Sequence, residues 1–215
     1  MTKQIVCTTT LYLLTLLPGM QSASAPISDA PAYTSGGSLV APTHYREWIY
    51  LSTGIDMSYE ATSGPPDHSK FYNVFVNPTA YRSFLETGTW PDKTVMVLEV
   101  RGADSPISIN QQGHTQSAEV MGLETHVKDR GKWSFFDDNG KLIPRSATCY
   151  TCHEAHAAVD TTFVQFYPTL LPLAREKKTL SPEYLKELTA PAHVAPGGGK
   201  VVQPEHGYRF RFYGC

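Results

Sequence analysis

The chain of 215 residues contains only 4 cysteines, which are too few and too unevenly placed to build a fold from disulfides. Cys149 and Cys152 lie close together, whereas Cys7 and Cys215 are far from them and from each other. Loss of an N-terminal leader, argued below, would remove Cys7 and leave an odd number of thiols. For Cys215, a free thiol or an intermolecular partner, we expect no function.

An excess of charge of one sign is also lacking. The 18 Lys and Arg residues nearly balance the 20 Asp and Glu residues, and the net charge of −2 is spread along the chain. Without a basic patch we expect no nucleic-acid partner, and without an acidic run we expect no solvating tail. Apolar residues make up 41% of the chain, so a domain of this length can bury a core of its own.

No apolar run reaches the roughly 20 residues that a membrane-spanning helix needs. The apolar stretch from about Ile5 to Leu17 follows Lys3 and precedes the small residues Ala23-Ser24-Ala25. A charged start, a short hydrophobic run and an A-x-A ending are typical of a secretory signal peptide. We therefore expect residues 1–25 to be cleaved and the protein to be periplasmic or secreted, with no membrane association afterwards.

The rest of the chain predicts an α+β fold, with a mainly antiparallel sheet of four to five strands and a few helices. Residues 26–41 are rich in Ser, Pro, Ala and Gly, which predicts a disordered lead-in. The first ordered element is expected at 45–55, and further strands at 71–76, 94–101, 118–128 and 132–136. Helices are expected at 78–86, at 181–188 and, in a short form, around the two central cysteines, with loops at 58–70 and 101–116. A flexible linker is expected at Gly197-Gly198-Gly199.

The stretch Cys149-Tyr150-Thr151-Cys152-His153 has the spacing C-x-x-C-H, the attachment signature of c-type haem. In that chemistry each thiol adds to a haem vinyl group and the histidine ligates iron. A structural zinc site would need further ligands, and no second cysteine pair exists. A thioredoxin-like dithiol would need a βαβ pattern around it, which is absent. We predict one haem c bound covalently through Cys149 and Cys152, with His153 as the proximal iron ligand.

The sixth iron position decides between two classes of function. A methionine or histidine ligand there is typical of an electron-transfer cytochrome, whereas an open position binds small molecules. No candidate stands in a context that forces ligation, because each methionine could equally fill the core and each histidine could equally lie at the surface. The candidates are Met57, Met96, Met121, His114 and His126.

Several segments, in order along the chain, resemble the cytochrome P-460 family. They are YREWIYLSTG, NVFVNPTAYRSFLETGTWPDKTVMVLEV, GLETHVKD, KWSFF and CYTCHEAHAAVDTTFVQFYPTL. The resemblance covers roughly residues 42–172, so we place a haem domain at 42–174, with the haem-bearing helix near its C-terminal end, and a C-terminal extension at 175–215. It implies a c-type haem on a mainly antiparallel β fold, usually in a homodimer. The family includes hydroxylamine-oxidising enzymes, and relatives such as the beta type of cytochrome c prime, which bind nitric oxide without that activity.

Two departures from the hydroxylamine-oxidising members concern the haem pocket. Those members carry a lysine that cross-links to the haem in a VKE-like triplet, and the matching triplet here is Val97-Leu98-Glu99. Leu98 cannot form a carbon–nitrogen bond, so we expect no cross-link. Tyr72 stands where an arginine is expected. Glu124, by contrast, matches the family's distal carboxylate, which in the enzymes takes protons from the substrate.

Strand alternation indicates which side chains share a face. Met96 and Leu98 should share one face of their strand with Thr94 and Val100, and Glu124 and His126 should share one face of the next strand with Val120 and Gly122. A carboxyl group in an apolar pocket would have a raised pKa and could act as a base. Equally, Glu124 could be solvated or paired with Lys128 or Arg130, and His126 could face solvent.

The aromatic residues have both functional and structural interpretations. Phe71 and Phe75 share a face with Asn73, and a phenylalanine there could sit over the iron or simply pack in the core. Trp133, Phe135 and Phe136 are expected in the core. Phe163, Phe166 and Tyr167 are expected to pack on the proximal side of the haem.

Together these observations predict a periplasmic mono-haem c-type cytochrome with an open distal site for nitric oxide or another small nitrogen-oxide ligand. Weak redox activity and a redox partner protein are secondary expectations. The alternatives are a six-coordinate electron-transfer cytochrome and a hydroxylamine-oxidising enzyme that works without the lysine cross-link.

Overall fold

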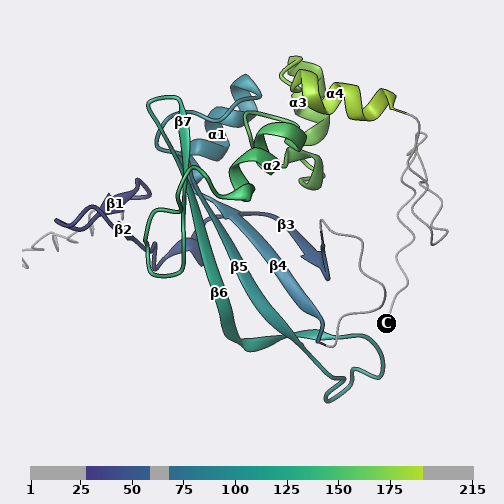
Figure 1. Ribbon diagram of the computed structural model, residues 1–215. Helices are drawn as coiled ribbons and strands as arrows, with labels where there is room; N and C mark the ends of the chain where they lie inside the picture. The colour runs from purple at the N-terminus through teal and green to yellow at the C-terminus, as the bar shows by residue number, and fades with distance from the viewer. Residues whose placement is uncertain (1–27, 59–67, 191–215) are drawn as a thin grey trace, which may run out of the picture.

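A computed structural model of the chain describes residues 28–58 and 68–190. Three predictions concern residues outside the described part: the signal peptide at 1–25, the glycine linker at 197–199 and the lack of a function for Cys215. Figure 1 shows an antiparallel sheet whose strands fan out below a group of helices gathered at one end. The α+β class predicted from the sequence is confirmed. In the described part of the chain, no helix is both long enough and apolar enough to cross a membrane.

The main sheet has five strands, and its strand order follows the chain, β3-β4-β5-β6-β7, with every neighbouring pair antiparallel. The strands are β3 (Ile49–Ile55), β4 (Lys70–Val76), β5 (Val95–Asp104), β6 (Thr115–Asp129) and β7 (Lys132–Phe136). A short 3-10 helix, η1 (Tyr45–Glu47), precedes β3. The region expected as one element at 45–55 is therefore a helical turn followed by a strand.

The β5–β6 hairpin is longer than predicted. The sequence suggested a loop at 101–116, but the strands stay paired out to Asp104 and Thr115. Polar residues fill this outer part, and backbone ladder bonds do not require apolar side chains. Register shifts near Arg101 break the strict alternation there, and beyond them Val120 no longer follows the pattern of Gly122 and Glu124.

Helix α1 (Pro78–Thr87) connects β4 to β5 and agrees with the prediction of a helix at 78–86. Pro78 occupies the first turn, and Gly88 ends the helix with a φ of 75°, a left-handed conformation that glycine adopts without strain. Asn77 occupies the N-cap position, but its side chain makes no capping hydrogen bond and bonds elsewhere. Its Oδ1 accepts from the Val95 N–H at 2.8 Å and its Nδ2 donates to the Lys93 carbonyl at 3.1 Å, which ties the helix start to β5.

The main hydrophobic core lies between the sheet and the helices. Trp90 and Phe84 are buried there with ring centroids 4.2 Å apart. Trp133, Phe135 and Phe136 are all buried, as predicted from the sequence. Phe136 belongs to a separate cluster with Leu39, Val95 and Val127.

The lead-in at 26–41 was expected to be disordered, and its described part is ordered instead. Strands β1 (Ala32–Tyr33) and β2 (Leu39–Val40) pair as a small hairpin. Leu39 is buried, and its N–H donates to the Gly140 carbonyl at 2.8 Å. The order therefore comes from contacts with residues about a hundred positions later, which local composition cannot reveal.

The predicted boundary at 174/175 does not divide the structure. Helix α3 (Leu171–Lys177) runs across it, and α4 (Pro182–Thr189) follows, with Ser181 as its N-cap. The helix expected at 181–188 is thus confirmed. Tyr184 of α4 is buried in the main core, so the folded domain continues at least through this helix.

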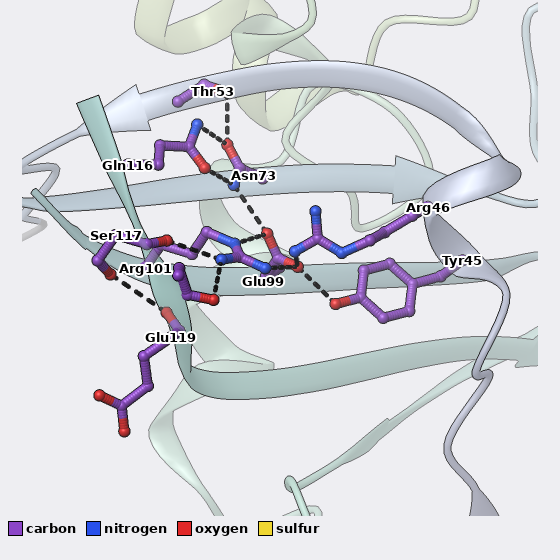
Figure 2. Close-up of polar contacts among 10 residues, drawn as sticks. Tyr45, Arg46, Thr53, Asn73, Glu99, Arg101, Gln116, Ser117 and Glu119 are labelled. Atoms are coloured by element: carbon purple, nitrogen blue, oxygen red, sulfur yellow. Dashed lines mark hydrogen bonds and ion pairs between the residues drawn. The ribbon is translucent and has the colours of Figure 1, made fainter. Parts of the chain in front are cut away.

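A buried polar cluster occupies the other face of the sheet, and Figure 2 shows it centred on Glu99. The Glu99 side chain is fully buried and accepts hydrogen bonds from the Tyr45 hydroxyl, from Asn73 and from the two arginines Arg46 and Arg101. Burial and the hydrogen bond to Glu99 raise the pKa of Tyr45 to about 12. The cluster fastens η1, which carries Tyr45 and Arg46, onto β5.

Candidate haem-binding site

A cavity of about 400 Å³ lies between one face of the sheet and the helical segment that carries the two central cysteines. The seven residues predicted from the sequence as haem-binding or catalytic line this one cavity, although they come from β5, β6, α2 (Thr148–His156), the 3-10 helix η2 (Val164–Phe166) and the residue that follows it. They are Leu98, Glu124, Cys149, Cys152, His153, Phe166 and Tyr167. Most of the remaining lining is apolar.

The sheet side of the cavity follows from strand alternation. Met96 and Leu98 face the cavity from β5, as predicted, and Glu124 and His126 face it from β6. Across the strands, Met96 pairs with His126 and Leu98 pairs with Glu124. These pairs form two successive cross-strand rows, about 7 Å apart along the strands.

A third row continues the wall beyond Leu98. Tyr72 on β4 lies between Gly54 of β3 and Val100 of β5, and Tyr72 and Gly54 line the cavity. Met57 also lines it, and its side chain occupies the space over Gly54, where a Cβ would overlap the Met57 Sδ. Gly54 therefore admits the Met57 thioether to the cavity wall.

Helix α2 places the two thiols and the histidine toward the cavity together. Cys149, Cys152 and His153 are spaced i, i+3 and i+4, so they lie on neighbouring parts of one helix face. Both cysteines are free thiols. The helix is fixed from its other side by Tyr150, which is buried, stacks on Phe135 with centroids 4.3 Å apart, and accepts from the Phe135 N–H at 2.9 Å.

His153 is held in one tautomer. Its Nδ1 lies 2.8 Å from the Thr161 carbonyl oxygen, which can only accept, so Nδ1 carries the proton and Nε2 keeps its lone pair. Phe163 packs on the ring at a centroid distance of 4.2 Å and Phe135 at 4.8 Å. Burial lowers the pKa of His153, which favours the neutral imidazole that a metal requires.

His126 is a wall residue of the cavity, and the alternative that it faces solvent is wrong. Its ring stacks on Phe135 at 3.9 Å and meets the His153 ring edge-on at 5.3 Å. Burial, together with the neighbouring His153, lowers the pKa of His126 to about 3. His126 is therefore neutral, and its ring is the part of the sheet wall that contacts the ring of His153.

Glu124 faces the cavity one row farther along. Neither cation suggested by the sequence pairs with it, because Lys128 bonds to Asp160 and Arg130 pairs with Asp129. The His126 Nε2 lies 3.9 Å from one of the Glu124 carboxyl oxygens. About half of the Glu124 side chain (54%) is exposed, so the carboxyl group is partly solvated, and the partial desolvation by the cavity wall raises its pKa.

Several other sequence candidates lie away from the cavity. Met121 is exposed, and His114 bonds to the Asp104 carbonyl at the far end of the hairpin. The suggestion that a phenylalanine of 71–76 covers the iron is wrong, because Phe75 packs against Tyr45 on the other sheet face and Phe71 shares its parity. The cavity is faced by Tyr72 and Val74 instead.

Sequence reasoning missed part of the site. Ser52, Gly54, Val74 and Thr162 line the cavity without any chemical signature that would reveal them. Thr161 contributes only a backbone carbonyl, which any residue could supply, so no residue type could have signalled it.

The family model for cytochrome P-460 matches residues 42–164, more than half of the chain. The chain belongs to the cytochrome P-460 family. Its members are haem proteins, and the donor set of the cavity fits that group: one neutral imidazole and two free thiols line the same largely apolar space. Within 28–58 and 68–190, no three His, Cys, Asp or Glu side chains are grouped so that they could hold a metal ion by themselves. No curated protein is similar enough to match the chain.

Proposed function

We propose that this family member is an exported mono-haem c-type cytochrome whose iron keeps an open position for nitric oxide or another small nitrogen-oxide ligand. The observation that carries the proposal is the cavity whose sheet wall consists of three successive cross-strand rows. His153 lies beside the first row of the sheet wall, at His126, and the wall continues past Leu98 to Tyr72 and Gly54. His153, Cys149 and Cys152 would hold the haem, and Leu98, Tyr72 and Gly54 would belong to the wall of the same cavity.

The residues present assign the binding roles. Cys149 and Cys152 would form the two thioether bonds, and the His153 Nε2 would ligate the iron. Phe163, which touches His153, and Tyr167 would pack beside the ligand on the proximal side, with Phe166 at the cavity rim. When bound, the haem supplies a redox-active iron with one position for a small ligand.

Leu98 and Glu124 set the character of the wall where a ligand would bind. Leu98 offers no amine for a cross-link, so the haem would stay an ordinary c-type haem. An apolar wall suits a neutral diatomic ligand, because it offers no compensation for a buried charge. Glu124, with its raised pKa, could accept a proton from a bound nitrogen compound, which favours hydroxylamine oxidation without a cross-link as the alternative activity.

A second candidate function rests on Met57. Of the five side chains considered as sixth ligands, Met96 and His126 lie in the row nearest His153, and Met121 and His114 lie away from the cavity. Met57 alone of the five lies at the third row. If its thioether bound the iron, the protein would be a six-coordinate electron-transfer cytochrome.

The two functions are separated by a titration of the reduced holoprotein with nitric oxide, in wild type and in Met57→Leu. An open site predicts tight binding that the substitution leaves within about threefold. A Met57 ligand predicts weak binding in the wild type and a gain of tenfold or more in Met57→Leu, because the ligand no longer has to displace sulfur. Mass spectrometry of the haem peptide tests attachment: the mass should be that of the peptide plus one unmodified haem.

The setting of the protein completes the proposal. The predicted leader at 1–25 supports export to the periplasm, a location that also suits the attachment of a c-type haem. The family resemblance supports a homodimer, and a redox partner protein would supply or accept electrons. Size-exclusion chromatography with light scattering of the mature protein tests the dimer, and N-terminal sequencing tests cleavage.

A further inference from the structure

The turn that follows α2 has an unusual backbone. Asp160 and Thr161 have φ values of 49° and 56°, so two successive residues other than glycine adopt the left-handed conformation. This region is disfavoured for L-residues, and most of all for a β-branched residue such as threonine. The same turn presents the Thr161 carbonyl to the Nδ1 of His153. A backbone held in a sparsely populated conformation at a functional site must be held by its surroundings.

The side chain of Lys128 supplies one part of that hold. Its ammonium group pairs with the Asp160 carboxylate at 2.5 Å and donates to the Trp90 carbonyl at 2.7 Å. Both partners of the ion pair are largely buried, with 13% of the Lys128 side chain and 28% of the Asp160 side chain exposed. The pair thus links β6 to the turn at a place that water reaches poorly.

The residue after the turn is fixed as well. The Thr162 hydroxyl donates to the Val159 carbonyl at 2.6 Å and accepts from the Trp90 indole N–H at 2.8 Å. Val159 and Thr162 also form a β-bridge across the turn. Trp90 therefore contacts both Lys128 and Thr162. The two residues with left-handed backbone, Asp160 and Thr161, are thus fixed on one side by Lys128 and on the other by Thr162.

We propose that Lys128 and Asp160 are positioning residues that set the iron's redox potential through the Thr161 carbonyl. The inference rests on the proposed role of His153 as the axial ligand. A hydrogen bond from the distant ring nitrogen orients an axial imidazole and raises its basicity, so it stabilises the ferric state. The Lys128–Asp160 pair keeps Thr161 in the conformation that makes this bond.

The test is the midpoint potential and the iron–imidazole stretching band of the holoprotein, in Lys128→Met and Asp160→Asn. Loss of the pair should let the turn relax and lengthen the hydrogen bond. We expect a higher potential, equivalent to about a tenfold change in the ferric-to-ferrous ratio, or about 59 mV for one electron. The stretching band should move to lower frequency. Lys128→Arg, which keeps the charge, should restore most of the wild-type values.

Two further variants separate positioning from general stability. Lys93→Met removes a lysine from a neighbouring but exposed ion pair with Asp129, and should leave potential and band unchanged. Thr161→Gly keeps the carbonyl and removes a hydroxyl that has no hydrogen-bond partner among the described residues. Glycine adopts the left-handed conformation freely, so adding Thr161→Gly to Lys128→Met should return the potential toward the wild-type value.

The outcomes are distinct. A coloured Lys128→Met or Asp160→Asn protein with wild-type potential and band overturns the inference, even if its melting temperature falls. The same holds if Thr161→Gly fails to restore a shifted potential. A wild-type protein that matures without haem overturns the proposed function and this inference together.

Discussion

Glu124 lines a largely apolar cavity with about half of its side chain (54%) exposed, and partial desolvation is the main cause of its raised pKa. Its folded-state pKa is raised, so the folded protein favours the protonated form. Below the ordinary pKa of 4.5 the group is neutral in the folded and unfolded states alike. As the pH rises through the higher folded-state pKa, the folded protein is progressively destabilised.

Glu124→Gln should therefore change the pH dependence of stability in a definite direction. At pH 4 the holoprotein variant and the wild type should have similar free energies of unfolding. Toward pH 7 the variant should become the more stable of the two, because glutamine cannot ionise. Denaturant titrations at a series of pH values measure this difference, and a variant that is equally stable at every pH would contradict the desolvation of Glu124.

Glu99 differs from Glu124 in that its buried carboxylate is fully paired. Glu99→Ala would leave the guanidinium groups of Arg46 and Arg101 without their shared partner on the far sheet face. We expect a loss of about 3–5 kcal/mol in the free energy of unfolding. The absorption spectrum of the haem should stay unchanged, because the cluster lies on the face opposite the cavity.

The control for this prediction is Asp129→Asn, which breaks the exposed pair between Asp129 and Lys93. Solvent-exposed pairs contribute little, so this variant should unfold close to the wild-type denaturant midpoint. Equal losses in Glu99→Ala and Asp129→Asn would show that the buried cluster does not fasten η1 to the sheet.

At the scale of elements, α4 supports the helix that carries the cysteines. Ser181 donates from its hydroxyl to the Ala157 carbonyl at 2.6 Å, His156 of α2 bonds to Glu187 of α4, and Tyr184 of α4 is buried in the main core. The family match ends at residue 164, before α3 and α4, so these two helices extend the matched region with a structural contribution of their own.

Tyr184→Ala tests that contribution. Removing a buried aromatic side chain should cost about 3 kcal/mol of unfolding free energy. Leu188→Ala on the same helix is the matched control, because Leu188 is 51% exposed and its truncation should cost less than about 0.5 kcal/mol. Thermal or denaturant unfolding measures both. Similar small losses in the two variants would mean that α4 does not buttress the domain.

Elements with strong local signals could be predicted from the sequence. Pro78 and Gly88 bound α1 because each has a conformational preference that acts without distant contacts. The outer part of the β5–β6 hairpin could not be predicted, because its largely polar sequence lacks the apolar alternation by which a strand is recognised. Strand β2 could not be predicted either, since Leu39 is ordered by Gly140 and its neighbours.

In the candidate site, too, the residues with a local sequence signal could be predicted and those that depend on the fold could not. Cys149, Cys152 and His153 carry their signal in adjacent residues, so their grouping is visible without a fold. Leu98 and Glu124 lie on different strands, and only the family resemblance singled them out. The turn at Asp160 and Thr161 gave no signal, because it acts through backbone conformation and a carbonyl.

For the molecule as a whole, one face of the sheet contributes to the candidate haem site and the other contributes to stability. One face and α2 enclose the cavity, and the opposite face carries the buried cluster that holds η1. Changes on the far face should therefore alter stability without altering the haem, whereas changes at the turn after α2 should alter the haem's potential.

The central claim, a His153-ligated haem with an open distal position, is tested most directly by the absorption spectrum of the ferrous holoprotein. The account predicts the broad bands of a five-coordinate, high-spin haem, and the same spectrum in Met57→Leu. Sharp, split bands that are lost in Met57→Leu would show a methionine-ligated electron carrier and contradict the open site. A protein that is colourless after expression together with the factors that attach c-type haem would contradict the presence of the haem.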